Sequence, residues 1–159
     1  MRILVVSDTH GNYHLLNRIL KTAGTVDLFL HAGDGGNDLL QVAQDFPSLS
    51  VQGVTGNCDY FSARPQELLF EVGGKKIFLT HGHQYGVKRD LLRLILKGKE
   101  SGAELIIFGH THLPLFEQAH GLFIFNPGSL SRYSLGRSPS YGEIEIGPDG
   151  IKPEIKFLC

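Results

Sequence analysis

Side chains that can bind metal ions recur in this 159-residue sequence where short apolar segments end. Aspartate, asparagine and histidine gather in five such places, without paired cysteines. The five groups are Asp8 with His10, Asp34, Asn57 with Asp59, His81 with His83, and His110 with His112. Oxygen and nitrogen ligands of this kind suit manganese, iron, zinc or nickel. There are more candidate ligands than one ion needs. Two ions about 3.5–4 Å apart that share a bridging carboxylate would use them.

Each group has an ordinary structural explanation when it is taken alone. An aspartate after a strand is more often a turn residue or a helix cap than a metal ligand. The pair His110 and His112, in the sequence FGHTHL, is more informative, because closely spaced histidines have few structural uses. The joint occurrence of five groups at strand ends therefore favours one shared site over five unrelated turns.

The first half of the sequence predicts strands that alternate with helices. Buried strands are expected at Arg2–Val6, Asp27–His31 and Leu49–Val54. Apolar residues at helical spacing fall between them, over Leu16–Ala23 and Leu39–Phe46, and Asn12 is placed to cap the first helix. This alternation predicts parallel strands with right-handed crossovers. The carboxyl ends of such strands meet at one edge, where residues distant in sequence can converge.

The second half predicts hairpins around glycine-containing turns. The paired strands are expected at Leu68–Val72 with Lys76–Thr80, Phe116–Ala119 with Leu122–Phe125, and Tyr141–Ile146 with Ile151–Phe157. A strand at Glu104–Phe108 and a helix marked by Val87, Leu91, Leu94 and Ile95 complete the pattern. We expect an α/β fold with parallel strands early and antiparallel strands late, in two sheets packed face to face with helices outside. A single domain over residues 1–159 is expected.

Composition and charge narrow the classes of partner. The 42% of hydrophobic residues can form a core, and the net charge of −1, from 15 basic and 16 acidic residues, predicts no binding of long nucleic acids. Two cysteines, Cys58 and Cys159, are too few for a disulfide framework, which suits the cytoplasm. The apolar start ends at Asp8, too early for a signal-peptide core, and no segment is long enough to span a membrane.

The order of the motifs resembles that of the calcineurin-like metallophosphoesterase superfamily. Members carry D-x-H, G-D, G-N-H-D/E, H and G-H-x-H in this order, and the sequence here reads SDTH, GD, GNCD, THGH and GHTH. The similarity continues to Asn126–Leu130 and so covers nearly the whole chain. The short length and the sequences GNCD, THGHQYG and NPGS are most similar to the small single-domain prokaryotic phosphodiesterases of that superfamily.

The resemblance implies a four-layer αββα sandwich, with two mixed β-sheets flanked by helices, and a site for two divalent ions. Manganese is the metal that it favours, with nickel, iron and zinc as alternatives. By motif, Asp8, His10 and His112 would hold one ion, Asn57, His81 and His110 the other, and Asp34 would bridge them. His83 is the alternative to His81 as a ligand; otherwise it supports the ligands or faces the phosphate.

The sequence departs from the family at Cys58, where many members have a histidine thought to protonate the leaving group. A thiol with an ordinary pKa of ~8.5 is a poorer proton donor at neutral pH, so the identity of the general acid stays open. Asp59 either orients neighbouring groups or is a turn residue. The candidate catalytic residues are therefore Asn57, Cys58, Asp59 and His83.

The reaction that the resemblance implies is hydrolysis of a phosphodiester by a metal-activated hydroxide. We expect a small substrate, including nucleotide-like phosphodiesters, and no membrane partner, and a homo-oligomer is compatible with the sequence. Two alternatives stay open, a phosphomonoesterase and a catalytically weak interaction scaffold, because a eukaryotic retromer subunit resembles this fold. The presence of every candidate ligand favours the enzyme.

Overall fold

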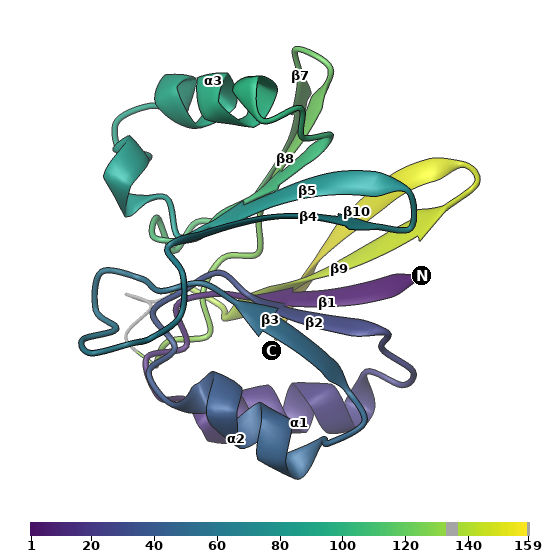
Figure 1. The fold of residues 1–159 in the computed structure, drawn as a ribbon. Helices are drawn as coiled ribbons and strands as arrows, with labels where there is room; N and C mark the ends of the chain where they lie inside the picture. The colour runs from purple at the N-terminus through teal and green to yellow at the C-terminus, as the bar shows by residue number, and fades with distance from the viewer. Residues whose placement is uncertain (133–136, 159) are drawn as a thin grey trace.

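Two five-stranded β-sheets stacked face to face form the centre of the structure, a computed structural model that describes residues 1–132 and 137–158 (Figure 1). The first sheet has the strand order β10-β9-β1-β2-β3, and the second has the order β4-β5-β6-β8-β7. The strands are β1 (Arg2–Val6), β2 (Leu28–His31), β3 (Ser50–Gly53), β4 (Glu67–Val72), β5 (Lys75–Thr80), β6 (Leu105–Ile107), β7 (Leu115–Ala119), β8 (Leu122–Asn126), β9 (Ser140–Gly147) and β10 (Gly150–Phe157). The helices are α1 (Tyr13–Thr22), α2 (Asp38–Asp45) and α3 (Leu92–Glu100), and a single 3-10 turn covers His83–Tyr85.

Helices cover the outer faces of both sheets, α1 and α2 on the first sheet and α3 on the second (Figure 1). The alternation of side chains along β1 explains this packing. Ile3 and Val5 belong to the core between the sheets, whereas Leu4 and Val6 pack towards α1 and α2. Strands buried on both faces need such continuous apolar sequences. The predicted four-layer αββα sandwich is confirmed.

Both sheets are mixed. In the first sheet β1, β2 and β3 are parallel and β9 runs antiparallel to β1. In the second sheet β5, β6 and β8 are parallel, with β4 and β7 antiparallel at the edges. The prediction of antiparallel strands late in the chain is therefore right for the three hairpins and wrong for the centre of the second sheet. There α3 makes a crossover between β5 and β6, which lets these strands run in parallel.

The structure corrects two local predictions about helices. The third helix begins at Leu92 rather than near Val87, and Asp90 Oδ1 accepts a hydrogen bond from the backbone N–H of Leu92 at 3.0 Å at its start. Asn12 is the N-cap residue of α1, as predicted, but its side chain makes no capping bond. Its Oδ1 accepts from Arg132 Nε at 3.2 Å instead, and its Nδ2 donates to the Leu130 carbonyl at 2.7 Å.

Two predictions from composition can be placed on the structure. Within residues 1–132 and 137–158, every helix is too short or too polar to cross a membrane. Cys58 is exposed, and Cys159 lies outside the described residues, so the lack of a disulfide stays a prediction.

Candidate metal centre

The candidate ligands lie at the carboxyl ends of strands from both sheets. In the first sheet Asp8 follows β1, Asp34 follows β2 and Asn57 follows β3, and in the second His81 follows β5 while His110 and His112 follow β6. The loops after β1 and β6 meet directly, because the backbone N–H of His110 donates to Asp8 Oδ2 at 3.0 Å. The structure thus brings together groups from the two halves of the chain.

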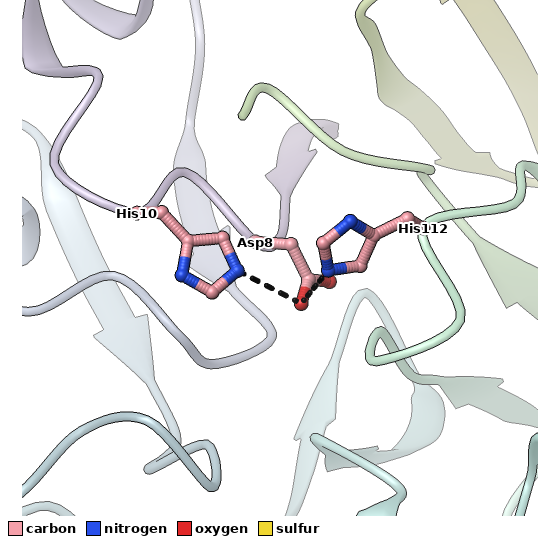
Figure 2. Close-up of side chains that lie close together, drawn as sticks. All are labelled: Asp8, His10 and His112. Carbon is pink, nitrogen blue, oxygen red and sulfur yellow. Dashed lines mark ion pairs between the residues drawn. The ribbon is translucent and has the colours of Figure 1, made fainter. Parts of the chain in front are cut away.

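Asp8 lies between two imidazoles (Figure 2). Its Oδ1 is 3.1 Å from His112 Nε2 and 3.9 Å from His10 Nε2. A third imidazole, that of His81, places its Nε2 4.0 Å from the same oxygen. Asp8 is completely buried, whereas the His10 and His112 side chains reach solvent, so this group opens on one side.

Asp34 forms the neighbouring part of the centre. Its Oδ2 is 3.3 Å from His81 Nε2 and 3.9 Å from His10 Nε2. Asn57 Oδ1 approaches His81 Nε2 at 3.0 Å. The described residues contain three sets of three donor atoms, and within each set the atoms lie within 4.8 Å of one another. The sets are Asp8–His10–His112, Asp8–Asp34–His81 and His10–Asp34–Cys58. The overlap of these sets would let adjacent cations share Asp34 or Asp8.

His110 and His83 lie at the side of this arrangement. The His110 ring centroid is 5.0 Å from that of His81 and 6.1 Å from that of His83. Neither residue belongs to the donor sets found in the described part of the chain. Because His81 rather than His83 turns its Nε2 towards Asn57 and Asp34, the geometry supports His81 as the candidate ligand.

Hydrogen bonds fix the orientation of the ligands. His81 Nδ1 is 2.8 Å from the Ala32 carbonyl, which can only accept, so the ring carries its proton there and leaves Nε2 free. Ser7 Oγ donates to Asp8 Oδ2 at 2.6 Å. Asp8 Oδ1, by contrast, is buried without a hydrogen-bond donor among the described residues. A buried carboxylate oxygen that faces only imidazole nitrogens fits a cation, so the donor set suits a divalent metal.

Asp59 organises the backbone beneath the centre. Its carboxylate accepts hydrogen bonds from the N–H groups of Asp34 (2.9 Å), Gly36 (2.6 Å) and Gly56 (2.8 Å). These bonds tie the loop after β2 to the loop after β3. Gly56 is required there, since an added Cβ would lie 2.0 Å from Asp34 Oδ1.

The backbone at the centre is strained. Left-handed φ values are unfavourable for residues other than glycine. Five candidate ligands adopt them: Asp8 (52°), His10 (46°), Asp34 (57°), His110 (65°) and His112 (60°). Strain of this kind collects at functional sites, where the rest of the structure holds it in place.

Burial and mutual charge shift the pKa values of the ion-free centre. Burial alone would raise the pKa of Asp34, but the hydrogen bond and charge of His81 outweigh it and hold this pKa well below its usual range. Burial would also raise the pKa of Asp8, but the neighbouring imidazoles of His112 and His81 lower it. The pKa of His81 is raised by Asp34 and Asp8 although burial opposes it. The two carboxylates and the His81 ring therefore favour each other's charged forms when no ion is bound.

Cys58 behaves as a protonated thiol. Desolvation, followed by the negative charge of Asp34, raises its pKa to about 11. Asn57 Nδ2 approaches Cys58 Sγ at 3.3 Å, and Cys58 N donates to Asp34 Oδ1 at 2.7 Å. The thiol thus lies beside the candidate ligands in its neutral form at neutral pH.

The segment Asn126–Leu130 contacts the centre in a way that sequence reasoning did not identify. Ser129 Oγ donates to the Asp8 carbonyl at 2.9 Å, and Asn126 Nδ2 donates to the Gly109 carbonyl at 2.9 Å. The segment therefore joins the loop of Asp8 to the loop of His110. Polar residues directly after an apolar strand, Asn126 and Ser129, were the available signal.

Comparisons with known proteins show what this chain is similar to. The family model of the calcineurin-like phosphoesterase superfamily domain matches residues 1–148. The probable metallophosphoesterase YsnB of Bacillus subtilis is 36% identical over 151 residues, which cover 94% of this chain and 86% of that protein. Phosphodiesterase YfcE of Escherichia coli is 30% identical over 170 residues, covering 91% and 88%. The crystal structure of Entamoeba histolytica Vps29 in complex with zinc shares the fold, with a TM-score of 0.76, 24% identity and 99% of each chain covered.

Proposed function

The chain belongs to the calcineurin-like phosphoesterase superfamily, and from this membership we propose that it hydrolyses phosphodiester bonds at a centre of two divalent ions. The observation that carries the proposal is the buried Asp8 Oδ1, which faces three imidazole nitrogens within 4.0 Å and has no hydrogen-bond donor in the described residues. The name of the relative YfcE supports diesters as the substrate class. We propose one domain over residues 1–159.

The proposed ligands are divided between the ions as the motifs indicate. Asp8, His10 and His112 would hold one ion, Asn57, His81 and His110 would hold the other, and Asp34 would be shared between them. Manganese is the proposed metal, with nickel, iron and zinc as alternatives, because the donors are oxygen and nitrogen. When bound, two such ions would lower the pKa of a water molecule towards neutrality and offset charge on the phosphoryl oxygens.

In the reaction, a water oxygen bonds to phosphorus, one ester P–O bond breaks, and a proton ends on the leaving oxygen. The Asn57 amide and the His83 ring lie beside the centre and can donate to phosphoryl oxygens. The pKa of Cys58, raised to about 11, makes its thiol a weak acid for protonating the leaving group. We therefore propose that good leaving groups such as aryloxides react fastest.

Metal analysis combined with a substrate panel tests the proposal. Protein purified without chelators should contain about two divalent ions per chain. It should hydrolyse bis(p-nitrophenyl) phosphate faster than p-nitrophenyl phosphate when manganese is added. Preference for the second compound would identify a phosphomonoesterase instead. The fold shared with Vps29 makes a weakly catalytic scaffold the other candidate, and absence of turnover with any of the four metals would favour it.

The remaining proposals concern partners and location. The proposed partner is a small phosphodiester, and the cytoplasm is the proposed location because the chain has only two cysteines. A homo-oligomer is testable by light scattering of the purified protein.

A further inference from the structure

Two exposed aromatic side chains lie in the loop that follows Cys58 and Asp59. Tyr60 is 80% exposed, and Phe61 is fully exposed. Phe61 also has a left-handed φ of 61°, a conformation unfavourable for a bulky side chain. Exposure and backbone strain both disfavour phenylalanine at this position, so packing does not explain its presence.

Tyr60 and Phe61 line a groove with a volume of about 810 Å³. The other contributors include Leu40 from α2, Cys58, Arg64 and Pro65. Leu40 is itself largely exposed and adds apolar surface. A groove of this size falls within the range of small-molecule sites, about 300–1,000 Å³.

The groove borders the candidate metal centre, because Cys58 belongs to both. Donor atoms of Cys58, His10 and Asp34 lie within 4.8 Å of one another. Asp59, which also lines the groove, holds the backbone N–H of Asp34 at 2.9 Å. A molecule in the groove can therefore extend a phosphate into the centre.

Hydrogen bonds fix the two ends of the aromatic loop. Thr55 Oγ1 donates to the Arg64 carbonyl at 2.7 Å, and Thr55 N donates to the Pro65 carbonyl at 2.8 Å. The Arg64 guanidinium donates to the Gly36 carbonyl at 2.9 Å and lies 3.8 Å from Asp59 Oδ2. The ends of the loop that presents the aromatic side chains are thus held in place, and the pair of Arg64 and Asp59 lies at the groove.

We propose that this groove binds the base of a nucleoside phosphodiester whose phosphate lies at the metal centre. The inference rests on the proposed function and names its substrate class. Bases stack on aromatic side chains with little dependence on their identity, and an arginine beside them strengthens such sites. A nucleoside ester is favoured over an apolar peptide because the groove, apolar at Tyr60, Phe61 and Leu40, continues into a candidate cation-binding centre that suits a phosphate.

The first test compares two diesters that share one leaving group. Thymidine 5′-(p-nitrophenyl phosphate) and methyl p-nitrophenyl phosphate both release p-nitrophenolate, so the ratio of their kcat/KM values isolates the nucleoside. Wild-type protein should prefer the thymidine ester by about tenfold or more. A ratio near one would overturn the proposal.

Substitutions assign the preference to the groove. Phe61→Gly suits the left-handed backbone and should not lower the thermal midpoint, yet it should reduce the ratio by about tenfold. Tyr60→Ala, which leaves Phe61 and its backbone unchanged, should reduce the ratio as well. Leu96→Ala removes a comparably exposed apolar side chain from α3 and should leave the ratio unchanged. Equal ratios in wild type and both loop variants would contradict the proposal.

Calorimetric binding to protein purified without chelators separates this inference from the proposed function. Thymidine 5′-phosphate should bind about tenfold more tightly than ribose 5-phosphate, and Phe61→Gly should remove the difference. If this difference in affinity is found but neither ester is cleaved, the proposal of a base-binding groove is supported and the hydrolase proposal fails. If both esters are cleaved equally and both phosphates bind equally, the groove proposal fails and the hydrolase proposal stands. A peptide-binding groove would show no preference for the thymidine compounds in either assay and would also overturn the inference.

Discussion

The two ends of the stacked sheets use left-handed backbone in different ways. At the end with the hairpin turns, positive φ falls mainly on glycines, such as Gly73, Gly74 and Gly121. At the end with the metal centre, it falls on glycines and also on five candidate ligands. A turn needs only a reversing backbone, which glycine supplies without steric cost. A site needs particular side chains as well, and there the chain retains strained aspartate and histidine.

Substitution of Asp8 should produce the largest difference in activity between the two ends of the sheets. Asp8→Ala should lower kcat/KM for bis(p-nitrophenyl) phosphate by more than about a hundredfold, because a proposed ligand matters more than the groups that support ligands. The metal content should fall at the same time, as measured by elemental analysis. Asp149→Ala, at the turn between β9 and β10, should change neither quantity. Full metal-dependent activity in Asp8→Ala would show that the assignment of this centre is wrong.

The acidic residues of the two ends should also differ in their effect on stability. Asp59→Asn replaces a carboxylate that accepts three backbone hydrogen bonds, and we expect a loss of about 1.5–3 kcal/mol in the free energy of unfolding. Asp149→Asn, in an exposed turn, should change it by less than about 0.5 kcal/mol. Urea denaturation measures both. Similar values for the two variants would mean that Asp59 does not organise the loops.

The metal-centre end should make stability depend on pH. Burial lowers the pKa of His31 to about 4, against about 6.5 for an unfolded histidine. Since the folded pKa is the lower one, the contribution of His31 to stability is complete above pH 6.5. It declines as the pH falls towards 4, with a slope of up to about 1.4 kcal/mol per pH unit.

Urea denaturation of metal-free protein between pH 7 and pH 5 measures this slope. His31→Gln should give a shallower slope than wild type, and the exposed control His120→Gln should match wild type. Equal slopes for His31→Gln and wild type would assign the pH dependence to other groups.

The smallest effect should come from relieving strain at each end. His10 and His120 have similar φ values of 46° and 56°, one at the centre and one in the hairpin turn between β7 and β8. Replacement of either residue by glycine should stabilise the metal-free protein by up to about 1 kcal/mol. Only His10→Gly should reduce activity and metal content. Loss of activity in His120→Gly as well would erase the distinction between the two ends.

The sequence was sufficient to predict the layers, because apolar strands such as β1 and amphipathic helices such as α1 have distinct periodicities. It also placed polar groups at strand ends, and the structure brings Asp8, Asp34 and His81 together as the strand order requires. How these residues divide between ions stays a prediction.

Other features depend on tertiary contacts that local patterns do not contain. Asn12 is the N-cap residue of α1, but its side-chain oxygen accepts from Arg132 and its side-chain nitrogen donates to the Leu130 carbonyl, both more than a hundred residues away. The direction of β6 depends on how α3 packs rather than on the residues of the strand itself. The groove beside Cys58 depends on the backbone conformation of Phe61, and the spacing of apolar residues in the sequence does not predict that conformation.

The contact of Asp8 with His112 joins loops of different sheets, and this affects how an ion would bind. A cation shared by these residues would cross-link the two sheets. Its affinity would then include the free energy of docking one sheet on the other. Substitutions of inter-sheet residues such as Ile77 or Ile144 would therefore alter metal retention although they touch no donor atom. Chelation would correspondingly expose the connections between the sheets to proteases.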